Sequence, residues 1–89
     1  MTELPVDRSI IISRLKKIEG QVRGIQKMVG DERNCVDILT QLAAANSAMQ
    51  SAAGLVLRNY ASICLQEEEP EDIGEKLAHA ASIWIKGRS

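Results

Sequence analysis

The two cysteines, Cys35 and Cys64, are the residues of this chain best suited to chemistry. A thiolate is a nucleophile and also a soft metal ligand, so a cysteine pair suits redox chemistry or metal binding. The two cysteines lie 29 residues apart in a stretch without proline, and along a continuous helix that separation is roughly 43 Å. One chain therefore cannot join them. Two copies paired antiparallel would place Cys35 of one beside Cys64 of the other, at both ends of a symmetric dimer.

Two interpretations of the cysteine pair stay open on geometry alone. In the first, both cysteines are small buried hydrophobic residues, as free cysteines often are. In the second, Cys35 is the attacking thiol and Cys64 the resolving thiol, because Cys35 is predicted to start a helix and a helix N-terminus favours the thiolate. Two cysteines are too few for a four-cysteine zinc site, and no C-x-x-C pair is present. No resident metal is therefore expected.

The middle of the chain must position both cysteines, and its pattern predicts one long helix over about residues 35–66. Asn34 can cap the start of this helix, and Asp37 three residues later is an acidic variant of the capping box. One side of the helix is mostly apolar in alternating steps of four and three, the repeat of a coiled coil that seeks a partner helix. The residues of this seam are Cys35, Leu39, Leu42, Asn46, Met49, Ala53, Val56, Tyr60 and Ile63.

Two further helices flank the long one, so residues 1–89 are expected to form a single all-α domain. Residues 1–7 are expected to be a flexible arm. Helices are predicted over about 8–29 and 71–86, which gives a long–long–short order, and a second apolar stripe of the middle helix is expected to receive the first helix. The expected packing positions are Ile11, Leu15, Ile18, Val22, Ile25 and Val29 in the first helix, Ile38, Leu42, Ala45, Met49, Ala52 and Val56 in the middle helix, and Ile73, Leu77, Ala80, Ala81 and Trp84 in the third.

Charge is distributed unevenly along the chain, although the net charge is only −1. Between Arg8 and Met28 there are six basic residues and one acid, Glu19. Such a basic helix, in a chain with few aromatics, predicts contact with the phosphates of duplex DNA rather than stacking on single strands. A solvated helix face is the alternative. The candidate DNA-binding residues are Arg14, Lys16, Lys17, Arg23 and Lys27.

Nothing in the sequence predicts an enzyme. The chain has no catalytic constellation and no phosphate-binding loop, and its single histidine, His79, is expected to be a surface or packing residue. The polar N-terminus lacks the apolar core of a signal peptide, and no apolar run approaches membrane-spanning length. The protein is therefore expected in the cytoplasm without a membrane partner.

Two segments of the chain resemble those of a known family, the copper-sensitive operon repressor (CsoR-type) family. They are residues 14–25, RLKKIEGQVRGI, and residues 35–44, CVDILTQLAA. The resemblance implies an all-helical dimer with an antiparallel four-helix core, which assembles to a homotetramer. It also implies a transcriptional repressor that binds double-stranded operator DNA until an inducer reaches a site at the subunit interface. The family's DNA-contacting positions match Arg14 and Lys17, whereas a second basic position falls near Ser51.

The inducer varies among members of this family and depends on a few positions. The copper-type site resembles Cys, His and Cys at the positions of Cys35, Tyr60 and Cys64, and a neutral phenol is a poor ligand for soft Cu(I). The nickel or cobalt type has histidines where Glu3, Tyr60 and Cys64 stand, and the formaldehyde type has a proline where Thr2 stands. The persulfide-sensing branch keeps both cysteines and lacks the histidine, which is the pattern this chain matches best.

Three hypotheses follow from these observations. The first is a repressor released from its operator when Cys35 and Cys64 of the partner subunit react with persulfide or polysulfide species, with Tyr60 and Asn34 as their neighbours. The second is a repressor that responds to Cu(I) held by the same two thiolates. The third, of another class, is a helical thiol scaffold that does not bind DNA.

Overall fold

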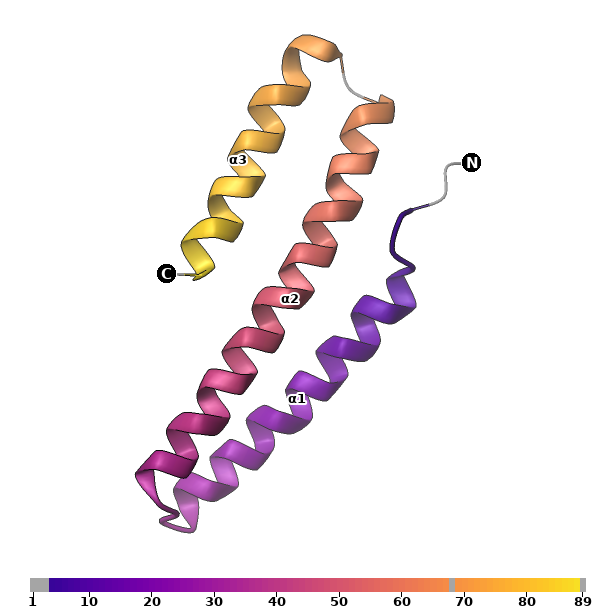
Figure 1. The fold of residues 1–89 in the computed structure, drawn as a ribbon. Helices are drawn as coiled ribbons and strands as arrows, with labels where there is room; N and C mark the ends of the chain where they lie inside the picture. The colour runs from indigo at the N-terminus through magenta and orange to yellow at the C-terminus, as the bar shows by residue number, and fades with distance from the viewer. Residues whose placement is uncertain (1–3, 68, 89) are drawn as a thin grey trace.

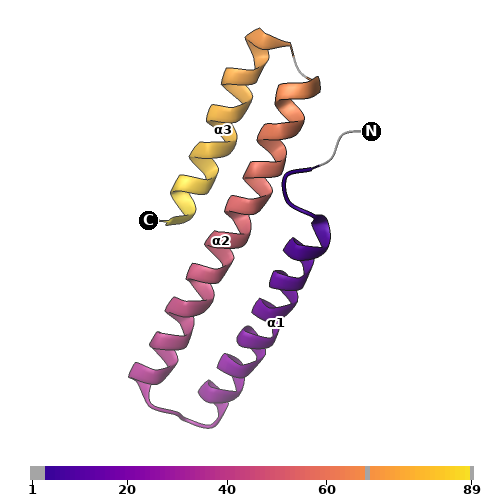
Figure 2. The same ribbon diagram turned by 45° about the vertical axis from the view of Figure 1, so that its right-hand side comes forward.

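Three helices make up the fold in a computed structural model that describes residues 4–67 and 69–88. They are α1 (Arg8–Gly30), α2 (Cys35–Glu67) and α3 (Pro70–Arg88). α1 and α3 lie antiparallel to α2, on opposite sides of it (Figure 1), and Figure 2 shows the same order from a second direction. No strand occurs within the described ranges. The predicted all-α class with long, long and short helices is confirmed.

Local structure delimits α1 at both ends. At its start, the Asp7 carboxylate accepts the backbone N–H and the hydroxyl of Ser9, both at 2.8 Å, and these hydrogen bonds hold the pKa of Asp7 below its ordinary value. Beyond its end, the chain turns through Glu32, whose φ of 55° is left-handed, a conformation that residues other than glycine adopt less readily. The short turn makes α1 and α2 an antiparallel pair.

The start of α2 is capped by Asn34, as predicted. The side-chain oxygen of Asn34 accepts the backbone N–H of Val36 at 2.8 Å, which satisfies one of the unpaired N–H groups of the first turn. Asp37, the expected partner in a capping box, instead lies 3.9 Å from the guanidinium of Arg33. Both side chains of that ion pair are exposed, so it contributes little to stability.

The interface between α1 and α2 joins isoleucines of one helix to alanines of the other. Ile11, Ile18 and Ile25 are buried at intervals of seven residues along α1. Ala45 and Ala52 are buried on α2, and their small side chains let the two helices approach closely. Ile18 is only 4% exposed, and truncating such a side chain to alanine costs about 2–5 kcal/mol.

Only part of each predicted packing stripe faces the other helix of the same chain. In α1, Leu15 and Val22 alternate with the buried isoleucines and remain exposed. In α2, Leu42, Met49 and Val56 are about half exposed, at 47%, 49% and 52%. α1 therefore covers only part of the second stripe of α2, including Ala45 and Ala52. A stripe built on steps of four and three is wider than the contact line with one neighbouring helix, so its outer edge is left uncovered.

The molecule is a single layer of helices with an uncovered apolar face. Its Cα atoms extend over 54 × 27 × 13 Å, and one helix with its side chains is about 10–12 Å across. A layer this thin cannot bury both of its faces. The exposed apolar residues that follow one another along α1 and α2, here called the apolar face, are Leu15, Val22, Val29, Leu39, Leu42, Met49 and Val56.

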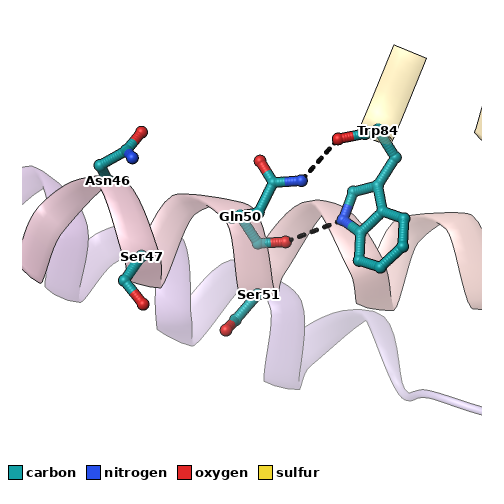
Figure 3. Close-up of a pocket in the computed structure, with 5 residues that line it drawn as sticks. All are labelled: Asn46, Ser47, Gln50, Ser51 and Trp84. Carbon is teal, nitrogen blue, oxygen red and sulfur yellow. Dashed lines mark hydrogen bonds between the residues drawn. The ribbon is translucent and has the colours of Figure 1, made fainter. Parts of the chain in front are cut away.

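α3 is attached to the middle of α2 by its tryptophan. The indole Nε1–H of Trp84 donates to the backbone oxygen of Gln50 at 3.1 Å, and the Gln50 side-chain amide donates to the backbone oxygen of Trp84 at 2.6 Å (Figure 3). Gly54 lies against the indole ring, where an added Cβ would be 3.5 Å from it. This reciprocal pair fixes where the C-terminal part of α3 meets α2.

Residues 4–7 do not form the loose arm that the sequence predicts. Val6 and Asn59 of α2 are both buried, at 7% exposure. The side chain of Asn59 accepts the backbone N–H of Val6 and donates to the backbone oxygen of Val6, both at 3.0 Å. A buried amide needs partners for its polar atoms, and the backbone of the arm supplies them. The remainder of the predicted arm, residues 1–3, lies outside the described residues.

Candidate functional site

The two cysteines occupy opposite ends of α2 and differ in exposure. Cys35 is the first residue of α2 and is exposed, whereas Cys64 lies near the other end and is only 1% exposed. Both are free thiols. Because α2 is continuous between them, they are roughly 43 Å apart along the helix. One protomer does not bring them together.

Cys64 fits the interpretation as a small buried hydrophobic residue, whereas Cys35 fits the interpretation as a reactive thiol. The burial of Cys64 within one chain is what the reading as a small hydrophobic residue predicts. The exposure of Cys35 at a helix start is what the reading as an attacking thiol requires. The sequence did not predict this asymmetry of exposure, because the repeat along α2 does not show which positions its own chain covers. A reagent in solution therefore reaches Cys35 first, and Cys64 only after the chain around it opens.

The neighbours of the two thiols provide few further metal ligands. Tyr60 is half-buried and lies one helical turn before Cys64, on the same side of α2. The side-chain oxygen of Asn34 is already engaged in the helix cap, where it accepts the backbone N–H of Val36. The described residues contain no group of three or more His, Cys, Asp and Glu side chains that could hold a metal ion. A cysteine from each of two subunits fits Cu(I) in a two-coordinate thiolate site, but a site that needs an imidazole next to Cys64 does not fit Tyr60.

Basic residues line a groove between α1 and α2. Arg14, Lys17 and Gln21 form this groove of about 540 Å³ together with Ile18 and Ala48. We call it the basic groove. Its mouth carries two cationic side chains without an acidic residue among those that line it, which suits a phosphate-bearing partner.

A second groove between the same helices is largely apolar. It has a volume of about 410 Å³, and Leu15, Val22 and Met49 of the apolar face contribute to it. Ile18 lines both grooves, and it is one of the buried residues between the two helices. The two grooves therefore open on opposite faces of the α1–α2 pair. A partner that covers the apolar face leaves the basic groove accessible.

The five predicted DNA-binding residues do not form one surface. Arg14 and Lys17 share the basic groove, whereas Arg23 lines the apolar groove. Lys16 and Lys27 are exposed and line neither groove. Arg14 and Lys17 are thus the pair that the structure brings together.

Arg58 is a basic residue that the sequence reasoning missed. Ser51, where the resemblance expects a basic residue, is exposed and lines a polar pocket of about 350 Å³ beside Trp84 (Figure 3). Arg58 follows Ser51 by seven residues and is also exposed, so the two lie on one side of α2, as Ala48 of the basic groove does. The spacing of seven could have identified Arg58 as a charge on this surface.

His79 is exposed on α3. Its backbone oxygen accepts the hydroxyl of Ser82 at 2.7 Å, and no described cluster of metal-ligating side chains includes its imidazole. No helix within the described residues is both long enough and apolar enough to cross a membrane.

Comparison with known proteins decides the family. Residues 7–85 match the family described as metal-sensitive transcriptional repressors. The chain belongs to this family. The resemblance to CsoR-type repressors is confirmed by a relative that is 44% identical over 70 residues, the copper-sensing transcriptional repressor CsoR of Bacillus subtilis strain 168. That match covers 79% of this chain and 69% of the relative.

Two other relatives show how the family diverges. The copper-sensing transcriptional repressor RicR of Mycobacterium tuberculosis is 44% identical over 52 residues, which are 58% of this chain and 54% of RicR. This chain thus spans about half the length of that relative. The solved structure of the nickel-responsive transcriptional regulator InrS superposes with a TM-score of 0.82 at 27% identity, covering 94% of this chain and 99% of InrS. The fold is shared by proteins whose names give different metals.

Proposed function

We propose that this protein is a cytoplasmic, operator-binding transcriptional repressor that dimerises through its apolar face and binds double-stranded DNA through its basic groove. The observation that carries this proposal is the position of the two grooves on opposite faces of one layer of helices. One face is suited to a second copy of the chain and the other to phosphates. The membership of the chain in a repressor family supports the same assignment.

The apolar face supports an antiparallel pairing of two α2 helices. Its central residue, Met49, is also near the middle of α2, so a twofold axis near Met49 places the same apolar residues opposite one another. That pairing brings Cys35 next to the C-terminal part of the partner's α2, where Cys64 of the partner subunit lies. The dimer core would contain four helices, and two dimers would form the homotetramer.

Removal of one basic-groove charge should weaken DNA binding. In Arg14→Ala and in Lys17→Ala we expect a lower affinity for promoter DNA, and the slope of log affinity against log salt should fall by about one per lost phosphate contact. Both side chains are exposed, so the unfolding midpoint should stay close to that of the wild type. Fluorescence anisotropy at several salt concentrations measures both quantities.

Lys27→Ala is the matched control for the two groove variants. It removes the same charge from α1 at a residue that lies outside the basic groove, so its effect on the salt slope should be smaller. Arg58→Ala tests the surface that continues along α2. Wild-type affinity and slope in both groove variants would show that DNA binds elsewhere.

We propose a persulfide or polysulfide as the inducer, because the chain keeps both thiols and carries Tyr60 where the copper-type site has a histidine. The exposed Cys35 thiolate attacks a sulfane sulfur of a polysulfide, whose S–S bond breaks, and a shorter polysulfide anion leaves with the electron pair. Cys35 then carries a persulfide. The thiolate of Cys64 of the partner subunit attacks the Cys35 sulfur, forms a disulfide and releases hydrosulfide. Two thiols are oxidised, the polysulfide sulfur is reduced, and the thiol protons pass to water.

Cu(I) is the second candidate inducer. It is favoured by the two copper-sensing relatives at 44% identity and by the softness of two thiolates. Cys35 and Cys64 of the partner subunit would hold the ion between the two chains, without an imidazole from position 60. Cu(I) would connect the two chains by reversible coordination, whereas polysulfide would connect them by a disulfide bond between the two cysteines.

Intact mass spectrometry under denaturing, non-reducing conditions separates the two inducers. Reduced protein treated with tetrasulfide should give a species with the mass of two chains joined through Cys35 and Cys64, and reductant should reverse it. The sulfur proposal fails if tetrasulfide leaves only unmodified single chains while the reduced protein takes up stoichiometric Cu(I) in competition with a Cu(I) chelator.

A further inference from the structure

The contact between Asn59 and Val6 joins two distant parts of the chain. The side-chain oxygen of Asn59 accepts the N–H of Val6, and its side-chain nitrogen donates to the carbonyl of Val6, both at 3.0 Å. The two residues are 53 positions apart in the sequence. Asn59 is buried, at 7% exposure. Because both ends of one amide engage both polar groups of one residue, the contact fixes the orientation of the arm as well as its position.

This contact lies between the two functional regions. On α2, Asn59 is five residues before Cys64, which is a little more than one helical turn. On the arm, Val6 is followed by Asp7, the cap of α1. α1 in turn carries both charges of the basic groove. The two hydrogen bonds therefore connect the thiol-bearing end of α2 to the start of the helix that faces DNA.

We propose that Asn59 is the positioning residue through which a reaction at Cys64 changes the DNA-binding surface. This inference rests on the proposed function and specifies its regulation. Cys64 is 1% exposed, so it can be linked to Cys35 of the partner subunit only if the chain around it moves. That movement separates Asn59 from Val6. The first turn of α1 is then no longer held in place, and the basic groove loses its geometry.

The chain contains a matched control for this contact. Gln50 and Trp84 also form two reciprocal hydrogen bonds. The Gln50 side chain donates to the backbone oxygen of Trp84, and the Trp84 indole donates to the backbone oxygen of Gln50. They attach α2 to α3 and do not involve α1. Gln50→Ala thus removes the hydrogen bond from the Gln50 side chain and keeps the one from the Trp84 indole to the Gln50 backbone. It weakens the contact between α2 and α3 without touching the connection between Cys64 and the basic groove.

The test compares DNA affinity before and after treatment with tetrasulfide, and in parallel with Cu(I), in Asn59→Ala, Asn59→Asp and Gln50→Ala. In the wild type the reduced protein should bind more tightly than the treated protein by roughly 5–150-fold, the usual range of coupling between sites. In Asn59→Ala the reduced protein should already bind weakly, so the ratio should fall below about threefold. Asn59→Asp can accept the Val6 N–H but, when ionised, cannot donate to its carbonyl, and it should be intermediate. Gln50→Ala should keep the wild-type ratio.

Hydrogen exchange at the Val6 amide provides a readout that does not depend on DNA. The amide should exchange slowly in the reduced wild type, and faster after treatment and in Asn59→Ala. A lower melting temperature in Asn59→Ala with an unchanged affinity ratio would reduce Asn59 to a structural role and overturn the inference. If neither reagent releases the wild type from DNA, the proposed function fails. An unchanged Val6 exchange rate in the treated wild type would count against the positioning role alone.

Discussion

Met49→Glu should convert the protein to monomers at concentrations at which the wild type is dimeric. Met49 is 49% exposed in the single chain and contributes to the apolar groove, so in the proposed dimer it is covered by the partner. Near the twofold axis, two carboxylates would lie close together in an apolar contact. Unpaired buried charges cost several kcal/mol, which corresponds to more than about a hundredfold loss in association.

Sedimentation velocity over a range of protein concentrations measures this loss. The control is Ile85→Glu, which places the same charge at an exposed apolar residue of α3, away from the apolar face of α1 and α2. It should leave the dimer in place. An undisturbed dimer or tetramer in Met49→Glu would mean that the two α2 helices do not meet at this residue.

Cys35→Ser should abolish the response to polysulfide completely. Cys35 is the exposed thiol, and serine keeps its size and the cap at Asn34 while removing the nucleophile. Treated wild type should run as a covalent dimer on non-reducing gels and lose DNA binding. The variant should stay monomeric on the same gels and remain bound to DNA, because the buried thiol of Cys64 cannot reach the polysulfide and take over the first attack.

Cys64→Ser separates the first chemical step from the second. It should still gain sulfur at Cys35, visible as added mass on a single chain, but it should form no link between Cys35 and the partner. If the cross-link forms normally in Cys64→Ser, two Cys35 residues are joined and the antiparallel arrangement is wrong. Under the copper alternative, both serine variants should instead lose Cu(I) affinity, and no covalent dimer should form in any of them.

The sequence predicted the helices well because their signals are local. Asn34 begins α2 by a side-chain hydrogen bond to the second residue beyond it, and Asp7 begins α1 in the same way. Such caps depend on neighbours along the chain and can be identified without a tertiary structure. The buried isoleucines of α1 also lie where the helical repeat places them.

What the sequence could not supply is the division of apolar residues between two partners. Ile18 and Leu15 belong to the same predicted stripe, yet Ile18 is 4% and Leu15 39% exposed. A periodic pattern shows that a residue seeks burial, but not whether its own chain or a second copy buries it. The contact between Val6 and Asn59 could not be predicted from the sequence for a related reason. The two residues are 53 positions apart and come together only when α1 and α2 pack in one register.

The central claim is that the reduced protein binds double-stranded operator DNA and is released from it by sulfur chemistry. Anisotropy of a labelled promoter fragment, recorded while tetrasulfide or Cu(I) is added to the preformed complex, measures this in one experiment. Tetrasulfide should release the DNA as the covalent dimer accumulates, and reductant should restore binding. Release by stoichiometric Cu(I), with the complex intact in tetrasulfide, would contradict the sulfur proposal.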